Sequence, residues 1–150
     1  MHATGRFKVR GSANVLARIL ARAGGLPRRG EVAMELAVTP DAAGETWRRT
    51  FGGQDLTTRQ WEEGGLLVEE IGLMQIEFAL TAADGALGFR QVGARVGRGR
   101  RHVRLPRWLA PAVTARAWSD DGLRVEVEIR FPAAGLLCAY EGVLRKDAPR

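Results

Sequence analysis

Arg49 is the residue whose type and position could do the most chemistry. It lies in the alternating segment Glu45–Phe51, where the alternation places its side chain on the same face as Trp47. An arginine on an inner face needs a partner, because an unpaired buried charge is costly. Its planar guanidinium either pairs with the carboxylate or phosphate of an apolar ligand in a cavity, or it forms a structural ion pair or a cation–π contact with Trp47.

Glu69 is the natural partner for Arg49, because it shares a face with Leu67 and Ile71 in the segment Leu66–Ile71. As a general acid or base it would need a second group, and the sequence shows no obvious second carboxylate beside it. Tyr140, the only tyrosine, faces inward, either as a core aromatic or with its hydroxyl lining the same cavity. The predicted ligand-binding residues are Arg49, Glu69, Trp47 and Tyr140.

A dense basic run precedes Trp108. With His102 it contains Arg95, Arg98, Arg100, Arg101, Arg104 and Arg107. Either this segment is a solvated loop, or its cations bind phosphates or anionic lipid headgroups while Trp108 inserts at the interface. The predicted anion or membrane surface consists of Arg98, Arg100, Arg101, Arg104, Arg107 and Trp108.

Other kinds of site find little support in the sequence. His2 and His102 are far apart and lack further ligands, so we predict no metal site. No Ser-His-Asp or Cys-His arrangement follows from the spacing, so we assign no catalytic residue. The glycines of Gly93–Gly99 follow no strand-to-helix turn, and we predict no cofactor. Cys138, the single cysteine, is expected to be a small core residue.

The composition fits one globular β-rich domain over residues 1–150. The chain is 45% hydrophobic and 27% charged, with a net charge of +6 that comes almost entirely from arginine. That arginine richness fits a GC-rich genome as well as it fits a function, so the charge alone does not argue for nucleic acid, and we expect no nucleic-acid partner. Because no secretory signal and no long apolar run is visible, we predict a cytoplasmic protein.

The elements that must position these residues are mostly strands. Leu123–Phe131 alternates strictly between apolar and charged residues, as a half-buried antiparallel strand does. Similar segments recur along the chain, and Asp84-Gly85 and Asp121-Gly122 mark hairpin turns. Ser12 is a plausible N-cap for a helix of about three turns. The apolar residues of that helix recur at helical spacing, opposite two arginines, and are Val15, Leu16, Ile19, Leu20 and Ala23.

These elements predict a mainly β fold. About nine or ten antiparallel strands, each with one apolar face, must curl around a shared core. We expect a strongly curved meander or a barrel, with the single N-terminal helix packed against or plugging one opening. Arg98–Arg101 and Leu105–Pro111 are expected to form an irregular connection.

Several stretches match one family pattern in order and spacing. They are H-A-T-G-R-F-K-V-R-G near the start, Glu45–Gly53, Val68–Gly72, Leu105–Pro111, Asp121–Val127 and Gly135–Leu144. Together they resemble an uncharacterised bacterial domain-of-unknown-function family, whose members often lie C-terminal to saccharopine-dehydrogenase-like or short-chain-dehydrogenase-like domains. Members usually have a helical segment before the first strand and a tryptophan where this chain has Val143, so we expect a shortened N-terminus. The resemblance implies no activity of its own.

Three functional hypotheses follow. The first is a non-catalytic domain that binds a hydrophobic, anionic small molecule or lipid, accessory to the dehydrogenase-like protein partner that the resemblance implies. The alternative is an interaction or peripheral membrane-surface module that uses Arg95–Arg107. The third is a hydrolase or isomerase that uses Glu69 and Arg49.

Overall fold

The structure is a computed structural model that describes residues 1–12, 14–98 and 101–147. Its elements are β1 (His2–Gly11), α1 (Val15–Ala23), β2 (Gly30–Asp41), β3 (Gly44–Phe51), β4 (Gln54–Glu63), β5 (Leu66–Ile71), β6 (Met74–Ala83), β7 (Ala86–Arg98), β8 (Arg101–Arg104), β9 (Ala112–Asp120), β10 (Gly122–Phe131) and β11 (Gly135–Lys146). The predicted mainly β fold with one N-terminal helix is confirmed.

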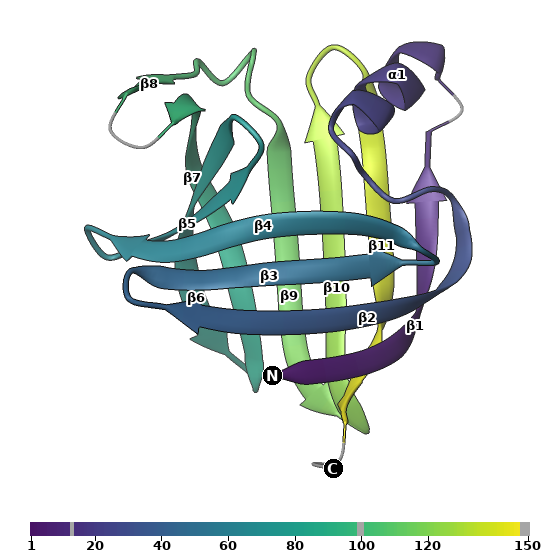
Figure 1. Cartoon of the computed structure of the whole chain (residues 1–150). Coiled ribbons are helices and arrows are strands. Elements are labelled where there is room, and N and C mark those ends of the chain that lie inside the picture. The colour runs from purple at the N-terminus through teal and green to yellow at the C-terminus, as the bar shows by residue number, and fades with distance from the viewer. Residues whose placement is uncertain (13, 99–100, 148–150) are drawn as a thin grey trace.

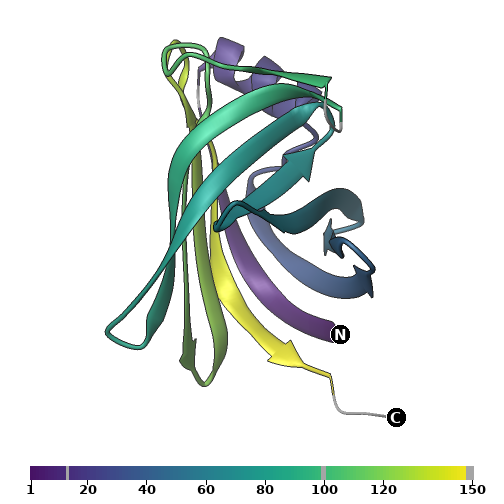
Figure 2. The same cartoon turned by 90° about the vertical axis from the view of Figure 1, so that its left-hand side faces the viewer.

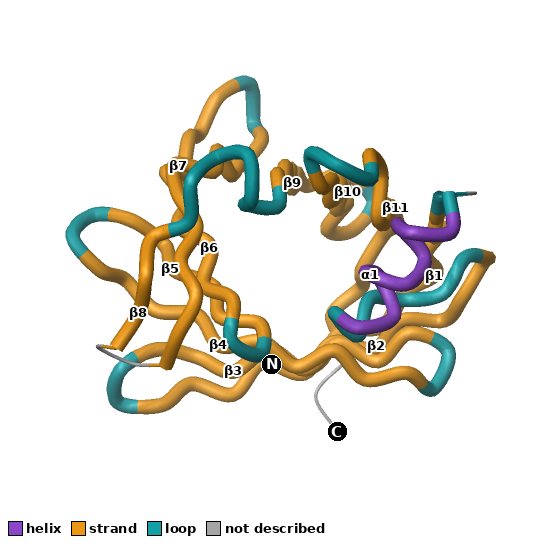
Figure 3. The backbone as a smooth tube through the Cα atoms, turned by 90° about the horizontal axis from the view of Figure 1, so that it is seen from above, coloured by secondary structure: helices purple, strands orange, loops and turns teal. Residues whose placement is uncertain are grey.

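The strands close into an antiparallel barrel. β1 to β6 form a meander, β1 also pairs with β11, and the sheet continues through β10 and β9 to β7, which pairs with β6 and closes the ring. Within the described residues the ring has ten strands, and β8 adds one more that pairs with β7 alone. Figure 3 looks down this ring, and Figure 1 shows β2, β3 and β4 crossing in front of β9, β10 and β11. An irregular connection was expected at Arg98–Arg101 and at Leu105–Pro111. The first expectation was wrong, because Arg98 on β7 pairs with Arg101 on β8, whereas residues 105–111 belong to no strand or helix.

Local backbone chemistry explains the turns and one close contact in the barrel wall. The β6–β7 hairpin turns at Asp84 and Gly85, whose φ angles of 52° and 72° suit the predicted Asp-Gly turn.

Gly142 on β11 lies opposite Phe7 on β1. A Cβ atom at Gly142 would lie 2.6 Å from the Phe7 ring, so only glycine lets this ring cover the neighbouring strand.

Two apolar clusters fill parts of the interior. The larger one includes the rings of Phe7, Phe51 and Tyr140, whose centroids lie 5.1–6.2 Å apart in tilted or edge-to-face contacts. The smaller one lies under the connection between β8 and β9 and includes Phe78 and Ala110. The barrel is therefore packed in two places and not through its whole interior.

The N-cap of the helix lies two residues later than the sequence suggested. Asn14 is the N-cap, and its side chain accepts a hydrogen bond from the backbone N–H of Leu16. Ser12 instead accepts a hydrogen bond from the Asn14 N–H, so the prediction of Ser12 as the cap was wrong. Gly24 ends the helix, with its N–H donating to Leu20 O.

The helix buries its small residues and exposes most of its large ones. Ala17 is fully buried, and Leu20 and Ala21 also pack against the larger cluster. The exposed apolar side chains of α1 are Val15, Leu16 and Ile19. A stripe of alanines lets α1 lie close to the barrel, so the apolar face expected from the sequence points largely to solvent. α1 has nine residues, and the described part of the chain holds no helix with the length and apolar character that a bilayer crossing requires.

Candidate functional site

A cavity of about 500 Å³ lies inside the barrel. Inward-facing residues of β2 to β7 and β9 to β11 form its wall. It reaches the end of the barrel formed by the β6–β7 and β9–β10 turns, where Gly85 and Ser119 line it. We call this the open end. α1 and the connection 105–111 lie at the rim of the other end, which we call the capped end, and both ends are visible in Figures 1 and 2.

The cavity exists because the barrel is wide and one wall carries small side chains. A barrel of about eight strands is just wide enough to be filled by side chains, and this ring is larger. β9 lines the cavity with Ala115 and Ala117 at alternate positions, together with Val113 and Ser119. The sequence reasoning did not single out this wall, although alternating small residues in Ala112–Asp120 were the signal that could have located it.

Arg49, Glu69 and Thr58 form a closed polar triangle on the cavity wall. Arg49 donates from one terminal nitrogen to Thr58 Oγ1 at 2.9 Å and from the other to Glu69 Oε1 at 3.1 Å. Thr58 in turn donates to Glu69 Oε1 at 2.8 Å. The side chains of Arg49 and Glu69 are only 11% and 17% exposed, so the predicted pair is present and largely desolvated. The sequence reasoning missed Thr58.

The strand register explains why these three groups meet. Arg49 on β3 lies directly opposite Leu56 on β4, which brings it within one pleat of Thr58. Glu69 on β5 lies opposite Gln60 on β4, so all three side chains point to the same inner face. β4 therefore carries the hydroxyl that links an arginine and a carboxylate from the strands on either side of it.

Charge and burial act on the Arg49 pKa in opposite directions. Burial is the largest single effect and lowers the pKa of this guanidinium, but the charge of Glu69, the interaction with Tyr140 and the hydrogen bond to Glu69 together outweigh it, so the pKa is raised above its ordinary value. Arg49 therefore stays charged, and Glu69 neutralises it. The guanidinium carbon also lies 5.1 Å from the centroid of the Trp47 ring, so an ion pair and a cation–π contact occur together. The Trp47 Nε1–H donates to Glu45 at 2.7 Å.

Tyr140 brings a hydroxyl to the same cavity from the opposite wall. It lies on β11 between Val9 of β1 and Val127 of β10. Burial raises the pKa of Tyr140 to about 12, and the nearby positive charge of Arg49 only partly opposes this. Its hydroxyl forms no hydrogen bond within the described ranges 1–12, 14–98 and 101–147, so the O–H group can still donate to a ligand.

Apolar side chains remain uncovered at the open end. Leu80, Leu87 and Leu123 line the cavity, yet each is at least 39% exposed to solvent. They come from the strands on either side of the β6–β7 and β9–β10 turns. The open end therefore offers an apolar rim through which a hydrophobic molecule can reach Arg49.

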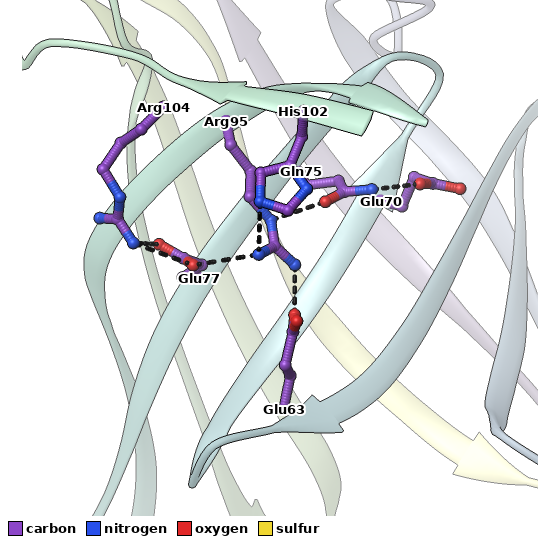
Figure 4. Close-up of polar contacts among 7 residues, drawn as sticks. All are labelled: Glu63, Glu70, Gln75, Glu77, Arg95, His102 and Arg104. Carbon is purple, nitrogen blue, oxygen red and sulfur yellow. Dashed lines mark hydrogen bonds and ion pairs between the residues drawn. The ribbon is translucent and has the colours of Figure 1, made fainter. Parts of the chain in front are cut away.

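A second polar cluster lies outside the barrel, under β8 (Figure 4). Arg95 is buried there and donates to Gln75 at 2.7 Å and to Glu63, and it lies 3.6 Å from Glu77. The hydrogen bond from Arg95 holds the pKa of the Glu63 carboxyl below its usual value. Arg104 on β8 pairs with Glu77 at 2.8 Å. This cluster attaches β8 to the barrel wall.

The structure therefore divides the predicted basic surface. Arg104 is ion-paired with Glu77, and Arg95 is buried, which the reading of one continuous basic run did not anticipate. Arg100 lies outside the described residues. The described members of the predicted surface, Arg98, Arg101, Arg104, Arg107 and Trp108, are all exposed, and the Arg104 side chain stays 65% exposed despite its pairing with Glu77.

The remaining titratable groups add no further centre. Among the residues that the structure describes, no three His, Cys, Asp or Glu side chains lie close enough to hold a metal ion. Cys138 is buried in the larger cluster, and burial raises its pKa to about 11, as expected for a core thiol.

Comparisons with known proteins agree with the fold. The family model described as a domain of unknown function (DUF4166) matches residues 1–144. No curated protein matches the chain. A crystal structure of a protein with unknown function from the DUF3598 family of Nostoc punctiforme is similar, with a TM-score of 0.57 and 10% sequence identity. The match covers 97% of this chain and 46% of that one, so this chain spans less than half the length of that neighbour.

Proposed function

Because the chain belongs to the DUF4166 family, a domain of unknown function, its activity has to be argued from the cavity, and we propose that the barrel binds a hydrophobic small molecule or lipid with an anionic end. The observation that carries this proposal is an apolar cavity with a desolvated arginine in its wall. No catalytic step on the bound molecule is part of the proposal.

The size and lining of the cavity support a small apolar ligand. Its volume of about 500 Å³ falls within the usual range for small-molecule sites, roughly 300–1,000 Å³. Protein interiors normally pack without voids, and apolar walls left in contact with water lose stabilisation that a ligand restores. The exposed leucines at the open end, Leu80, Leu87 and Leu123, would be covered by the same ligand.

The polar groups suggest how the anionic end would be held. The Arg49 guanidinium has more N–H groups than the two that Thr58 and Glu69 use, and the Tyr140 hydroxyl is a further donor. A carboxylate would accept from both, because oxyanions form the stronger, charge-assisted hydrogen bonds. The ligand carboxylate would compete with Glu69 for Arg49, so binding would replace the Arg49–Glu69 ion pair with one between Arg49 and the ligand.

The same geometry argues against Glu69 as a general acid or base. Its Oε1 already accepts hydrogen bonds from Arg49 and Thr58. A catalytic carboxylate works best beside the reacting group with a partner of matched pKa, and the nearest carboxylate in the cavity lining, Glu45, is bound to Trp47. Binding without chemistry is therefore the better proposal.

A dehydrogenase-like partner stays a prediction from the resemblance alone. A barrel that holds an apolar acid could present it to such an enzyme, and co-purification of the two proteins would be the first measurement. If the two proteins did not co-purify, the proposal that the barrel binds a ligand would still stand.

Ligand binding can be tested with three ten-carbon ligands that differ only in their polar end: decanoate, decanol and decylamine. Each competes with a fluorescent fatty acid for the barrel, and we expect the affinity to fall in the order decanoate, decanol, decylamine. The variant Ala115→Leu/Ala117→Leu fills the cavity from β9. It should weaken decanoate binding roughly tenfold or more, since overpacking costs about 1–3 kcal/mol.

The matched control is Ala112→Leu, the same change on the outer face of the same strand. It should leave binding unchanged. Equal binding by the filled variant and the control, or tighter binding of decylamine than of decanoate, would contradict the proposal.

A further inference from the structure

The capped end of the barrel exposes large apolar side chains on two separate segments. On α1, Val15 is 60% exposed and Ile19 is 58% exposed. On the connection 105–111, Trp108 is 69% exposed and Leu109 is 41% exposed. Single exposed apolar residues are common, but several at one end of a small protein mark an interaction surface.

The orientation of α1 is the stronger part of this observation. The helix could have buried Val15 and Ile19, yet it packs through Ala17 and Ala21. Arg18 and Arg22 lie beside the exposed apolar stripe. A short helix with outward apolar residues flanked by arginines has the character of helices that lie in a membrane interface.

The segments of this end that carry the exposed apolar side chains bear charge of one sign. The sequence contains no Asp or Glu in residues 1–30, 85–119 or 131–140, which include α1, the connection 105–111 and the β10–β11 turn. In the parts of the chain that the structure describes, Arg18, Arg22 and Arg107 form no ion pair. The carboxylates close to β8 are neutralised, since Glu63 pairs with Arg95 and Glu77 with Arg104.

The open end carries charges of both signs, because Asp120 and Asp121 pair there with Arg124 and Arg145. Asp84 lies at the β6–β7 turn, and Asp120 and Asp121 lie at the β9–β10 turn. α1 and the connection 105–111 therefore present arginines without an ion pair beside apolar side chains, whereas the arginines Arg124 and Arg145 at the open end are paired with carboxylates. An anionic surface is therefore attracted more strongly to the capped end.

We propose that the capped end docks on the surface of an anionic lipid bilayer. The apolar segments lie on opposite sides of the ring when it is seen from above (Figure 3). A peptide or a nucleic-acid strand would contact one segment, whereas a flat, deformable interface contacts both. Tryptophan and aliphatic side chains bury in that interface, and arginines pair with its phosphates.

This docking would fix the direction of the cavity. With the capped end on the lipid, the open end and its leucines would face water, away from the bilayer. Membrane docking does not depend on the ligand proposed above, because the two surfaces lie at opposite ends and share no residue.

Vesicle sedimentation tests the proposal with two lipid compositions, phosphatidylcholine alone and phosphatidylcholine with phosphatidylglycerol. We expect binding to the second and little to the first, weakening as salt rises. Arg18→Gln/Arg22→Gln should reduce binding about 30-fold, because each basic residue near an anionic surface contributes about 1 kcal/mol. Ile19→Ser and Trp108→Ser should each weaken it as well.

The matched control is Arg124→Gln/Arg145→Gln, which removes the same charge from arginines that pair with Asp120 and Asp121 at the open end. It should bind like the unchanged protein. Equal losses in both double variants would overturn the proposal, because net charge alone would explain them. Loss of vesicle binding in Ala115→Leu/Ala117→Leu would also overturn it, since lipid uptake into the cavity would then be the cause. So would binding to poly(U) RNA without binding to the anionic vesicles.

Discussion

Raising the pH should titrate one buried tyrosine and destabilise the barrel. Tyr140 is the only tyrosine of the chain. Burial raises its pKa from 10.0 to about 12 in the folded protein, although Arg49 acts in the opposite direction. In the unfolded chain the same hydroxyl regains water and titrates near its ordinary value.

The direction and size of the effect follow from this difference. Between pH 10 and 12 the folded protein keeps the proton that the unfolded chain has lost, so the free energy of unfolding falls as the pH rises. Below pH 10 the contribution is fully present. A difference of about 2 pKa units corresponds to about 3 kcal/mol. Cys138 acts in the same direction at slightly lower pH, because burial raises its pKa from 9.0 to about 11.

The assay is the absorbance of the phenolate, followed during a pH titration of the folded protein and of the protein in urea. We expect a midpoint near 12 in the first and near 10 in the second. Urea unfolding of Cys138→Ala isolates the Tyr140 contribution, and Tyr140→Phe should abolish it. A folded-state midpoint near 10 would refute the reasoning, since it would place the hydroxyl in water and not in the cavity wall.

Three further predictions concern packing and ion pairs. Arg49→Leu should lower the free energy of unfolding by roughly 3–5 kcal/mol, because it leaves Glu69 buried without its charged partner. Arg49→Leu/Glu69→Leu should recover most of this loss in urea unfolding. A loss in the double variant equal to the sum of the two single losses would contradict a coupled pair. Gly142→Ala should lower the free energy of unfolding by roughly 1–3 kcal/mol, and the melting temperature with it, because the added Cβ would crowd the Arg6 carbonyl oxygen and the Phe7 ring; an unchanged melting curve would argue against these contacts. Arg95→Met removes a 3.3 Å contact between the Arg95 guanidinium and the His102 ring on β8, so hydrogen exchange in Arg101–Arg104 should become faster while the rest of the barrel stays protected; equal exchange in the two proteins would show that Arg95 does not hold that strand.

The arginines show where sequence patterns stop being informative. Arg49 could be placed on the inner face, because alternation along one strand decides which side a residue occupies. Arg95, Arg104 and Arg107 are close neighbours in a single basic run, yet the first is buried, the second is paired with Glu77 and the third is exposed. Their difference depends on carboxylates that lie far away in the sequence, so no local pattern could separate them.

The sequence by itself determined the strands other than β8, the hairpin turns and the inward direction of Arg49, Glu69 and Tyr140. These follow from side-chain periodicity and turn chemistry, which act between near neighbours in the chain. Only the tertiary structure decided the pairing of β6 with β7 that closes the ring, the space left beside Ala115, and the face of α1 that turns outward. Each of these depends on how side chains from distant strands fill a common interior, and that volume is not encoded in any one segment.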